Sequence, residues 1–349
     1  MALFGFGRKK TTVGLDIGSG LIKLCEISHA GGEPTLTKVA FATVSDDAIV
    51  EGEIIDAGVV ADAIRELFAS NGIKAKDAAI AVGGRDVIIK KISMDRMNED
   101  DAREVIRWEA EQHVPFDMEN VELDFQILDP DGEGLQMTVL LVAAKRELVE
   151  SRISLLTEAG LDAKVIDVDA FALHNAFELN HPDELGGIVG LINIGYETTN
   201  INILEDGIPT LTRDMPLGTR RLREDLQRER GVSGEEAEAM IRGGERNEIL
   251  DPFVAQRGDE LATGIERAAA FLQSSSRSGG QIARLYLVGG GARVPGLAKV
   301  LSDRLRVPVE LGNPFGRLNI ADGVFDDINM DEVAPLLMLP IGLALRTAA

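Results

Sequence analysis

The sequence predicts an α/β protein built from two similar lobes. Strand-like runs alternate with helical patterns along the whole chain, and 349 residues suffice for about two domains at roughly 100–200 residues each. One turn motif also occurs twice, since Asp16-Ile17-Gly18 and Asn193-Ile194-Gly195 each lie between two strand-like runs, about half the chain apart. A solenoid would need a short repeat, so this spacing indicates two lobes with a ligand cleft between them.

Strands are expected where apolar and β-branched residues alternate or run together between turn residues. The predicted strands are Thr12–Ile17, Ile22–Ser28, Ala78–Val82, Val87–Ser93, Val121–Leu128, Thr138–Ala144, Ala163–Asp167, Gly187–Ile194, Thr199–Glu205 and Ile282–Val288.

Helices are expected where apolar residues recur every three or four positions. The predicted helices are Gly58–Asn71, Glu99–His113, Lys145–Ala159, Phe171–Asn180, Thr219–Arg230, Gly234–Gly243, Asp259–Ser276 and Pro295–Arg306. Asn98 precedes three acidic residues at one helix start, and Gly160 follows a helix end. Ser233 and Glu236 form a capping box.

Composition excludes several classes of function. Lys and Arg number 36 against 58 Asp and Glu, for a net charge of −22, which opposes nucleic-acid binding. A single cysteine, Cys25, excludes internal disulfides and suits a reducing compartment; we expect it to be a small core residue. The longest near-apolar run, Ala334–Leu345, contains two prolines and is shorter than the about 20 residues of a spanning helix. We therefore expect a soluble protein.

The first turn has the residue types of a phosphate and metal site. In Thr12–Gly20, alternation places Asp16 on the opposite strand face from Val13 and Leu15. Gly18 and Gly20 permit a tight turn whose N–H groups can bind phosphate, with Ser19 between them, while Asp16 could hold hydrated Mg²⁺. A purely structural hairpin accounts for the same residues equally well. Lys23 either reaches a phosphate or only lies along its strand.

Two later segments extend this pattern. The turn after Asn193 contains Gly195 and then the hydroxyls of Thr198 and Thr199, although threonine also suits a plain strand. The strand-like run Leu285–Val288 leads into Gly289, Gly290 and Gly291 before a helix, which leaves room for a flat or anionic group. This is neither a Walker A loop nor a Rossmann fingerprint.

In this order, the three motifs resemble the first phosphate, second phosphate and adenosine loops of the actin-like ATPase superfamily, whose two-lobed fold is ribonuclease H-like. Further segments resemble the PilM family of type IV pilus assembly proteins, and the resemblance covers essentially the whole chain. These segments are Ile106–Phe116, Leu123–Phe125, Val168–Leu173, Pro216–Gly218, Glu235–Glu238 and Gly342–Arg346.

The resemblance implies a two-lobed fold like that of the division protein FtsA, in which an inserted subdomain 1C replaces the usual actin subdomain 1B. The implied division is residues 1–77 as the first part of subdomain 1A, 78–163 as 1C, 164–186 as the return to 1A, 187–330 as the second lobe (2A/2B) and 331–349 as a C-terminal segment packing back on 1A.

The resemblance also implies that ATP and Mg²⁺ bind between the lobes, with the metal held through water by Asp16. The implied binding residues are Asp16, Gly18, Ser19, Gly20, Lys23, Asn193, Gly195, Thr198, Thr199, Gly289, Gly290 and Gly291. Many relatives have Asp where this chain has Asn193, so we expect weak ATPase activity or none. Glu197 or Asp169 could polarise water, although Asp169 is favoured as a structural residue.

The implied partner is the N-terminal tail of PilN, bound in a groove between 1A and 1C at the cytoplasmic face of the inner membrane. Trp108, His113, Pro115 and Phe116 lie in or beside 1C, and Trp108 is expected to be packed. Other pilus platform and motor proteins would be contacted indirectly, and a homodimer could form.

The mixed charges of Arg220–Arg230 predict an exposed helix face. The alternatives are a filament-forming relative of FtsA or MreB and, less favoured, a sugar kinase.

Overall fold

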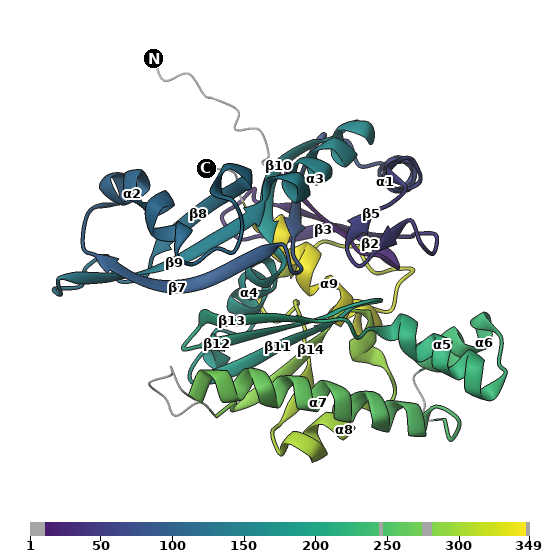
Figure 1. Ribbon diagram of the computed structural model, residues 1–349. Coiled ribbons are helices and arrows are strands. Elements are labelled where there is room, and N and C mark those ends of the chain that lie inside the picture. The colour runs from purple at the N-terminus through teal and green to yellow at the C-terminus, as the bar shows by residue number, and fades with distance from the viewer. Residues whose placement is uncertain (1–10, 244–246, 274–280, 347–349) are drawn as a thin grey trace.

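The computed structural model describes residues 11–243, 247–273 and 281–346. Two sheets lie one above the other, with two helices between them and further helices on their outer faces (Figure 1). We call the part built on the six-stranded sheet lobe 1 and the part built on the five-stranded sheet lobe 2. Among the described residues, no helix combines the length and the apolar character that crossing a membrane requires.

Lobe 1 contains the sheet with strand order β10-β6-β1-β2-β3-β16. Its strands are β1 (Thr11–Ile17), β2 (Leu21–Ser28), β3 (Thr35–Thr43), β6 (Asp77–Val82), β10 (Asp162–Val168) and β16 (Asn319–Ile320). Helices α1 (Ala57–Ser70) and α3 (Arg146–Glu158) cover its outer face, and a small ribbon of β4 (Ile49–Val50) and β5 (Glu53–Ile54) lies beside it. Val13 and Leu15 are buried under these helices, as the alternation in β1 predicts.

Lobe 2 contains the sheet with strand order β13-β12-β11-β14-β15. Its strands are β11 (Ile188–Ile194), β12 (Thr199–Glu205), β13 (Ile208–Met215), β14 (Arg284–Val288) and β15 (Val309–Leu311). Its helices are α5 (Thr219–Arg230), α6 (Gly234–Arg242), α7 (Asp251–Gln273) and α8 (Leu297–Leu305). The β11–β12 hairpin repeats the antiparallel β1–β2 hairpin of lobe 1, which is the internal echo expected from the sequence.

Helices α4 (Asp169–Asn180) and α9 (Met330–Ala344) lie between the two sheets and share one apolar core with both. The packing is tight, because a Cβ atom built on Gly14 would lie 2.0 Å from the carbonyl oxygen of Pro340. The carbonyl oxygen of Pro335 accepts the N–H of Gly289 at 2.8 Å, which ties α9 to the glycine-rich loop of lobe 2. The segment after residue 330 thus packs on lobe 1 and also contacts lobe 2.

A separate three-stranded sheet projects from lobe 1 (Figure 1). It has the strand order β7-β9-β8, formed by Val87–Asp95, Gln136–Lys145 and Val121–Ile127, and α2 (Glu99–Glu111) packs on it. The strands β6 and β10, at the two ends of the predicted insertion 78–163, pair instead with the central sheet of lobe 1. The projecting unit is therefore shorter than the predicted 1C subdomain.

Several details correct the sequence-based expectations. Trp108 is 76% exposed on α2 and not packed, whereas Cys25 is fully buried as expected. Helix α7 begins at Asp251, eight positions before the predicted start, because Gly258 within it packs closely on Val300 of α8 and does not end the helix. The predicted end of this helix, at Ser276, lies outside the described residues.

Candidate functional site

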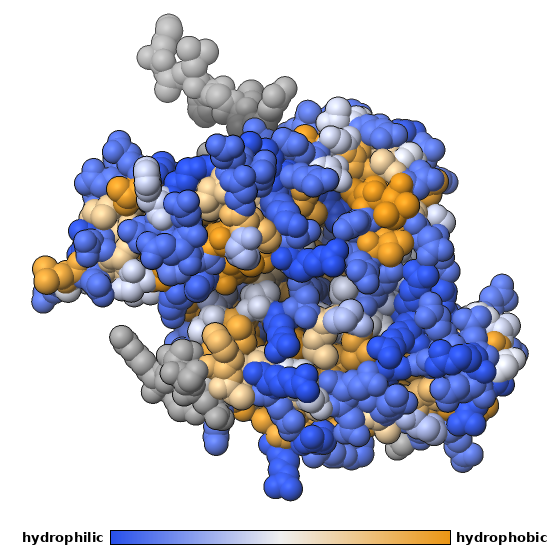
Figure 2. Space-filling model, in the orientation of Figure 1, coloured by the Kyte–Doolittle hydropathy of each residue, from blue (hydrophilic) through white to orange (hydrophobic). Residues whose placement is uncertain are grey.

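A cavity of about 1070 Å³ lies between the lobes and is lined by both of them. Figure 2 shows a hollowed band between the lobes where hydrophilic side chains gather. Ten of the twelve predicted binding residues line this cavity: Asp16, Gly18, Ser19, Gly20, Lys23, Asn193, Gly195, Thr198, Gly289 and Gly290. The three glycine-bearing motifs, which are distant in sequence, therefore converge on one space.

The other two predicted residues lie behind the cavity wall. Thr199 is fully buried, and its hydroxyl donates to the carbonyl oxygen of Leu217 at 2.5 Å. A Cβ atom on Gly291 would lie 2.2 Å from Cγ2 of Ile194, so Gly291 allows the glycine-rich loop to pack closely on the end of β11. Both residues support the cavity without lining it.

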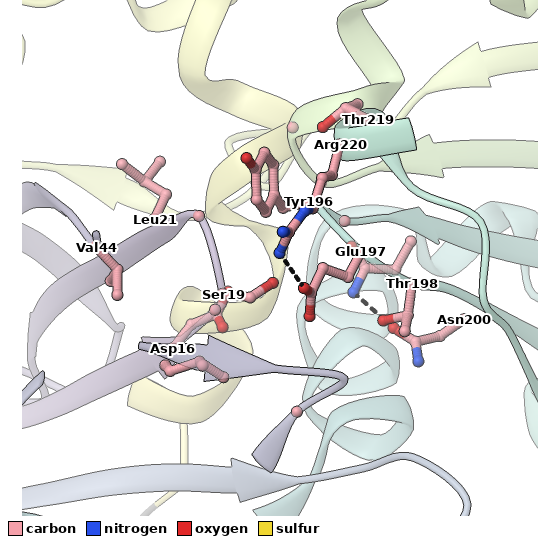
Figure 3. A pocket seen from close by; sticks show the side chains of 18 of the residues that line it. Asp16, Ser19, Leu21, Val44, Tyr196, Glu197, Thr198, Asn200, Thr219 and Arg220 are labelled. Atoms are coloured by element: carbon pink, nitrogen blue, oxygen red, sulfur yellow. Dashed lines mark hydrogen bonds and ion pairs between the residues drawn. The ribbon is translucent and has the colours of Figure 1, made fainter. Parts of the chain in front are cut away.

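The hairpin turns of the two lobes meet at the centre of the site (Figure 3). A Cβ atom on Gly20 would lie 2.8 Å from Cγ of Tyr196, so only glycine lets the first turn approach the second. Asp16 and Lys23 are cross-strand partners in the β1–β2 hairpin, and Lys23 Nζ lies 2.5 Å from Asp16 Oδ2. Lys23 lines the cavity and pairs with Asp16, a contact that neither sequence-based alternative included.

Asn193 is held in a chain of side-chain hydrogen bonds. Its Nδ2 donates to Oδ1 of Asn200 at 3.1 Å, and Nδ2 of Asn200 in turn donates to Oδ1 of Asp214. A Cβ atom on Gly289 would lie 2.4 Å from Asn193 Oδ1. The amide is therefore fixed in the sheet between β12 and the glycine-rich loop. Asn200 and Asp214, which sequence reasoning missed, both line the cavity.

Asp169 is the first residue of α4 and lies at the β13 side of the cavity. Its carboxylate packs against Gly83, where a Cβ atom would lie 2.2 Å from Asp169 Oδ2. Burial raises the pKa of Asp169 to about 7, and the charges of Asp16 and Asp214 add to this shift, whereas Arg152 opposes it. A carboxyl group that titrates near neutral pH at a cavity wall is typical of a functional site.

This raised pKa predicts a pH-dependent stability. Between about pH 4 and pH 7 the folded protein keeps a proton on Asp169 that the unfolded chain has lost, so the free energy of unfolding falls as the pH rises through this range. The substitution Asp169→Asn removes the titrating carboxyl group and with it this loss of stability. We therefore expect Asp169→Asn to stabilise the ligand-free protein by about 1–2 kcal/mol more at pH 8 than at pH 5, a value reduced because the side chain borders the cavity.

Urea unfolding at both pH values measures this difference, with the exposed Asp131→Asn as the control. Equal effects of Asp169→Asn at pH 5 and at pH 8 would contradict the raised pKa.

An ionic contact between residues that line the cavity joins the two lobes, and we call it the interlobe clasp. It consists of Asp46, Asp47 and Glu51 from lobe 1 and Tyr196, Glu197, Arg220 and Arg223 from lobe 2. Arg220 pairs with Asp47 at 2.8 Å and with Glu197 at 3.0 Å, and Arg223 pairs with Asp46 at 2.8 Å (Figure 3 marks the contact with Glu197).

Two further bonds complete the clasp. The Tyr196 hydroxyl donates to Asp46 at 2.9 Å, and the backbone N–H of Glu51 donates to Glu197 at 2.6 Å. The paired guanidinium groups hold the pKa of Asp46 below its ordinary value. Arg220 and Arg223 thus face the cavity, so the prediction that Arg220–Arg230 forms only an exposed helix face is wrong at these two residues. A charge run alone carries no signal of a partner in the other lobe.

No group of three or more His, Cys, Asp or Glu residues within 11–243, 247–273 and 281–346 is arranged to hold a metal ion directly. The cavity does fit a nucleotide in two respects. A Cβ atom on Gly290 would meet nothing within 4 Å, so the glycine-rich loop leaves open space at the wall. Arg152, in addition, is a buried cation at the wall with nitrogen atoms that lack a partner.

Comparison with known proteins relates this chain to one family, both by a family model and by a solved structure. A family model described as "Type IV pilus assembly protein PilM" matches residues 14–348. The solved "PilM-PilN type IV pilus biogenesis complex" contains a chain that is 28% identical, with a TM-score of 0.85 and coverage of 97% of this chain and 99% of that one.

More distant similarity extends to two other proteins. The cell division protein FtsA of Bacillus subtilis (strain 168) is 23% identical over 348 residues, covering 86% of this chain and 78% of FtsA. MreB 5 of Spiroplasma citri bound to AMPPNP is 13% identical, with a TM-score of 0.52 and coverage of 96% and 95% of the two chains. The predicted actin-like, two-lobed α/β fold is thus confirmed.

Proposed function

Because the chain belongs to the PilM family of type IV pilus assembly proteins, we propose that it is a nucleotide-binding scaffold of the pilus inner-membrane platform. In this proposal it lies at the cytoplasmic face of the membrane and binds the N-terminal cytoplasmic tail of PilN. The support for this partner is the likeness to a chain of the PilM–PilN complex over nearly the full length of both chains.

One observation carries the nucleotide part of the proposal, namely that the three glycine-bearing motifs meet in a single interlobe cavity. The base and ribose would lie at Gly289 and Gly290, and the phosphates would lie between the turns that contain Gly18 and Gly195. Asp16 would hold Mg²⁺ through water, and the metal would neutralise phosphate charge. MreB 5 of Spiroplasma citri, which has the same fold and was solved with AMPPNP bound, supports nucleotide binding.

The residues around the phosphates suit binding better than rapid turnover. Asn193 carries no charge, and its amide is already bonded to Asn200. Glu197, a candidate for polarising water, is bound to Arg220 and to the backbone of Glu51 in the interlobe clasp. We therefore propose that bound ATP acts mainly as a structural ligand that holds the two lobes together.

The PilN tail would bind between lobe 1 and the projecting three-stranded sheet. In this region Lys145 Nζ lies 5.1 Å from the centre of the Phe116 ring, and Lys90 Nζ lies 3.3 Å from Nδ1 of His113. Other platform and motor proteins would be contacted indirectly, and the membrane would be reached only through partners. A homodimer is compatible with this proposal, and nucleic acid is not proposed as a ligand.

Titration of a synthetic PilN N-terminal peptide tests this function. Since both lobes border the nucleotide site and β13 of lobe 2 contacts β7 of the projecting sheet, we expect MgATP to raise the peptide affinity by about 5- to 100-fold. By linkage, the peptide should raise the MgATP affinity by the same factor. Calorimetry in both orders of addition measures both effects.

Equal peptide affinity with and without MgATP would reject the coupling, and no peptide binding would reject the partner. The alternative, a filament-forming ATPase, is favoured only by the similarity to FtsA and MreB 5. Sedimentation with MgATP separates the two, because a filament would pellet whereas a scaffold would remain as small species.

A further inference from the structure

Arg152 is a buried cation that the sequence does not mark as a functional residue. It lies within α3 and faces the cavity, and only 7% of its surface is exposed. Its Nη2 donates to the carbonyl oxygen of Gly52 at 2.8 Å, which fixes the side chain in place. Its Nε and Nη1 are buried and have no hydrogen-bond partner among the described residues.

A buried guanidinium group with two unpaired nitrogen atoms is costly, because it has lost water and gained no full replacement. Asp169 and Asp16 attract it electrostatically, yet neither carboxylate accepts a hydrogen bond from these two nitrogens. An anion that enters the cavity would supply the missing acceptors. The local structure therefore indicates a ligand with negative oxygen atoms at this point.

The sheet order shows which end of a nucleotide would reach Arg152. In lobe 2 the order β13-β12-β11-β14 places Asp214 of β13 on one side of the β11–β12 hairpin and the glycine-rich loop after β14 on the other. Asp169 is on α4, which contacts β13, and its electrostatic interactions with Asp214 and Arg152 place both residues near it. A base at Gly290 and phosphates at the hairpin turns would thus direct the terminal phosphate toward Arg152.

The surroundings of Arg152 leave room for such a group. Gly52, which accepts the Arg152 bond, and Gly84 both line the cavity, and a Cβ atom on either would meet nothing within 4 Å. The free Nε and Nη1 of Arg152 would each donate a charge-assisted hydrogen bond to a phosphate oxygen.

We propose that Arg152 binds the γ-phosphate and so lets this site distinguish ATP from ADP. This role rests on the proposed nucleotide function. Arg152 is then a specificity residue, and it need not take part in hydrolysis. The competing explanation is that Arg152 only neutralises Asp16 and Asp169, in which case its loss would affect ATP and ADP alike.

The test is a titration of MgATP, MgAMPPNP and MgADP into the full chain and its Arg152→Gln variant, with dissociation constants measured by calorimetry. We expect Arg152→Gln to weaken MgATP and MgAMPPNP on the order of 10- to 100-fold, the range for one charge-assisted hydrogen bond, and MgADP by less than about 3-fold. Arg146→Gln is the matched control, because Arg146 lies on the same helix, pairs with Glu122 and does not line the cavity.

Arg152→Lys keeps the positive charge but loses the planar donors of the guanidinium group, so we expect an intermediate loss of MgATP affinity. This second variant keeps the test informative if Arg152→Gln fails to fold. Equal losses for MgATP and MgADP, or no loss for either, would overturn the role of Arg152 while leaving the nucleotide function in place. If the unmodified protein bound none of the three nucleotides, the proposed function itself would fail, and this inference with it.

Discussion

Gly290→Leu is expected to reduce nucleotide affinity by at least about 100-fold without unfolding the protein. Gly290 lines the interlobe cavity, and a Cβ atom there would meet no other atom within 4 Å, so the leucine side chain can be accommodated. It would then occupy the space proposed for the base and ribose. Calorimetric titration of MgATP measures the loss, and thermal unfolding of the ligand-free protein verifies the fold.

The neighbouring Gly289 is not a suitable position for this test. Gly289 has a φ of 80°, and a Cβ atom there would lie 2.4 Å from Asn193 Oδ1, so substitution would disturb the fold itself. Gly186→Leu is the matched control, because Gly186 is exposed, has similar open space and does not line the cavity. Unchanged MgATP binding by Gly290→Leu would remove the glycine-rich loop from the nucleotide site.

Asp16→Ala is expected to weaken MgATP binding by about 10- to 100-fold and to abolish the dependence of ATP affinity on Mg²⁺. The reason is that Asp16 faces the cavity at the end of β1, where its carboxylate would hold the water shell of the metal. Titrations of ATP with Mg²⁺ and with EDTA measure the metal dependence directly.

The same substitution also leaves Lys23 without its ion-pair partner at 2.5 Å. Lys23→Met breaks that pair too but keeps the carboxylate, so it serves as the control and should retain the Mg²⁺ dependence. If Asp16→Ala retained this dependence while Lys23→Met lost it, Asp16 would be only the structural partner of Lys23.

The parts of the site that the sequence predicts are those formed by neighbouring residues. A tight turn needs glycine within a few positions of the strand, and alternation in β1 alone places Asp16 opposite Val13 and Leu15. Such local rules identified both hairpin turns and the glycine-rich loop. They identified Thr199 and Gly291 as well, because local rules do not tell a residue that lines a cavity from one just behind it.

The parts that the sequence does not predict depend on contacts between distant segments. Helix α9 contains Pro335 and Pro340, which normally disfavour a helix, but burial between both sheets stabilises it. Arg152 has the helical spacing of a buried residue, because it lies three and four positions before Leu155 and Leu156, but only the packing of α3 shows that its guanidinium group faces the cavity. The predicted insertion 78–163 is too long for a similar reason. Strands β6 and β10 at its two ends belong to the sheet of lobe 1, and a strand's own residues do not show with which strands it pairs.

The interlobe clasp affects timing as well as structure. Its acidic side is rigid, because Val44, Ala48 and Ile49 anchor the loop that carries Asp46 and Asp47 in the core of lobe 1. The two lobes can move apart only when several of these contacts break together, and this movement would release a ligand that both lobes hold. Its residence time is then governed by how often the lobes separate, and dissolved salt, which weakens exposed ion pairs, would shorten that time even where the contacts inside the cavity stay the same.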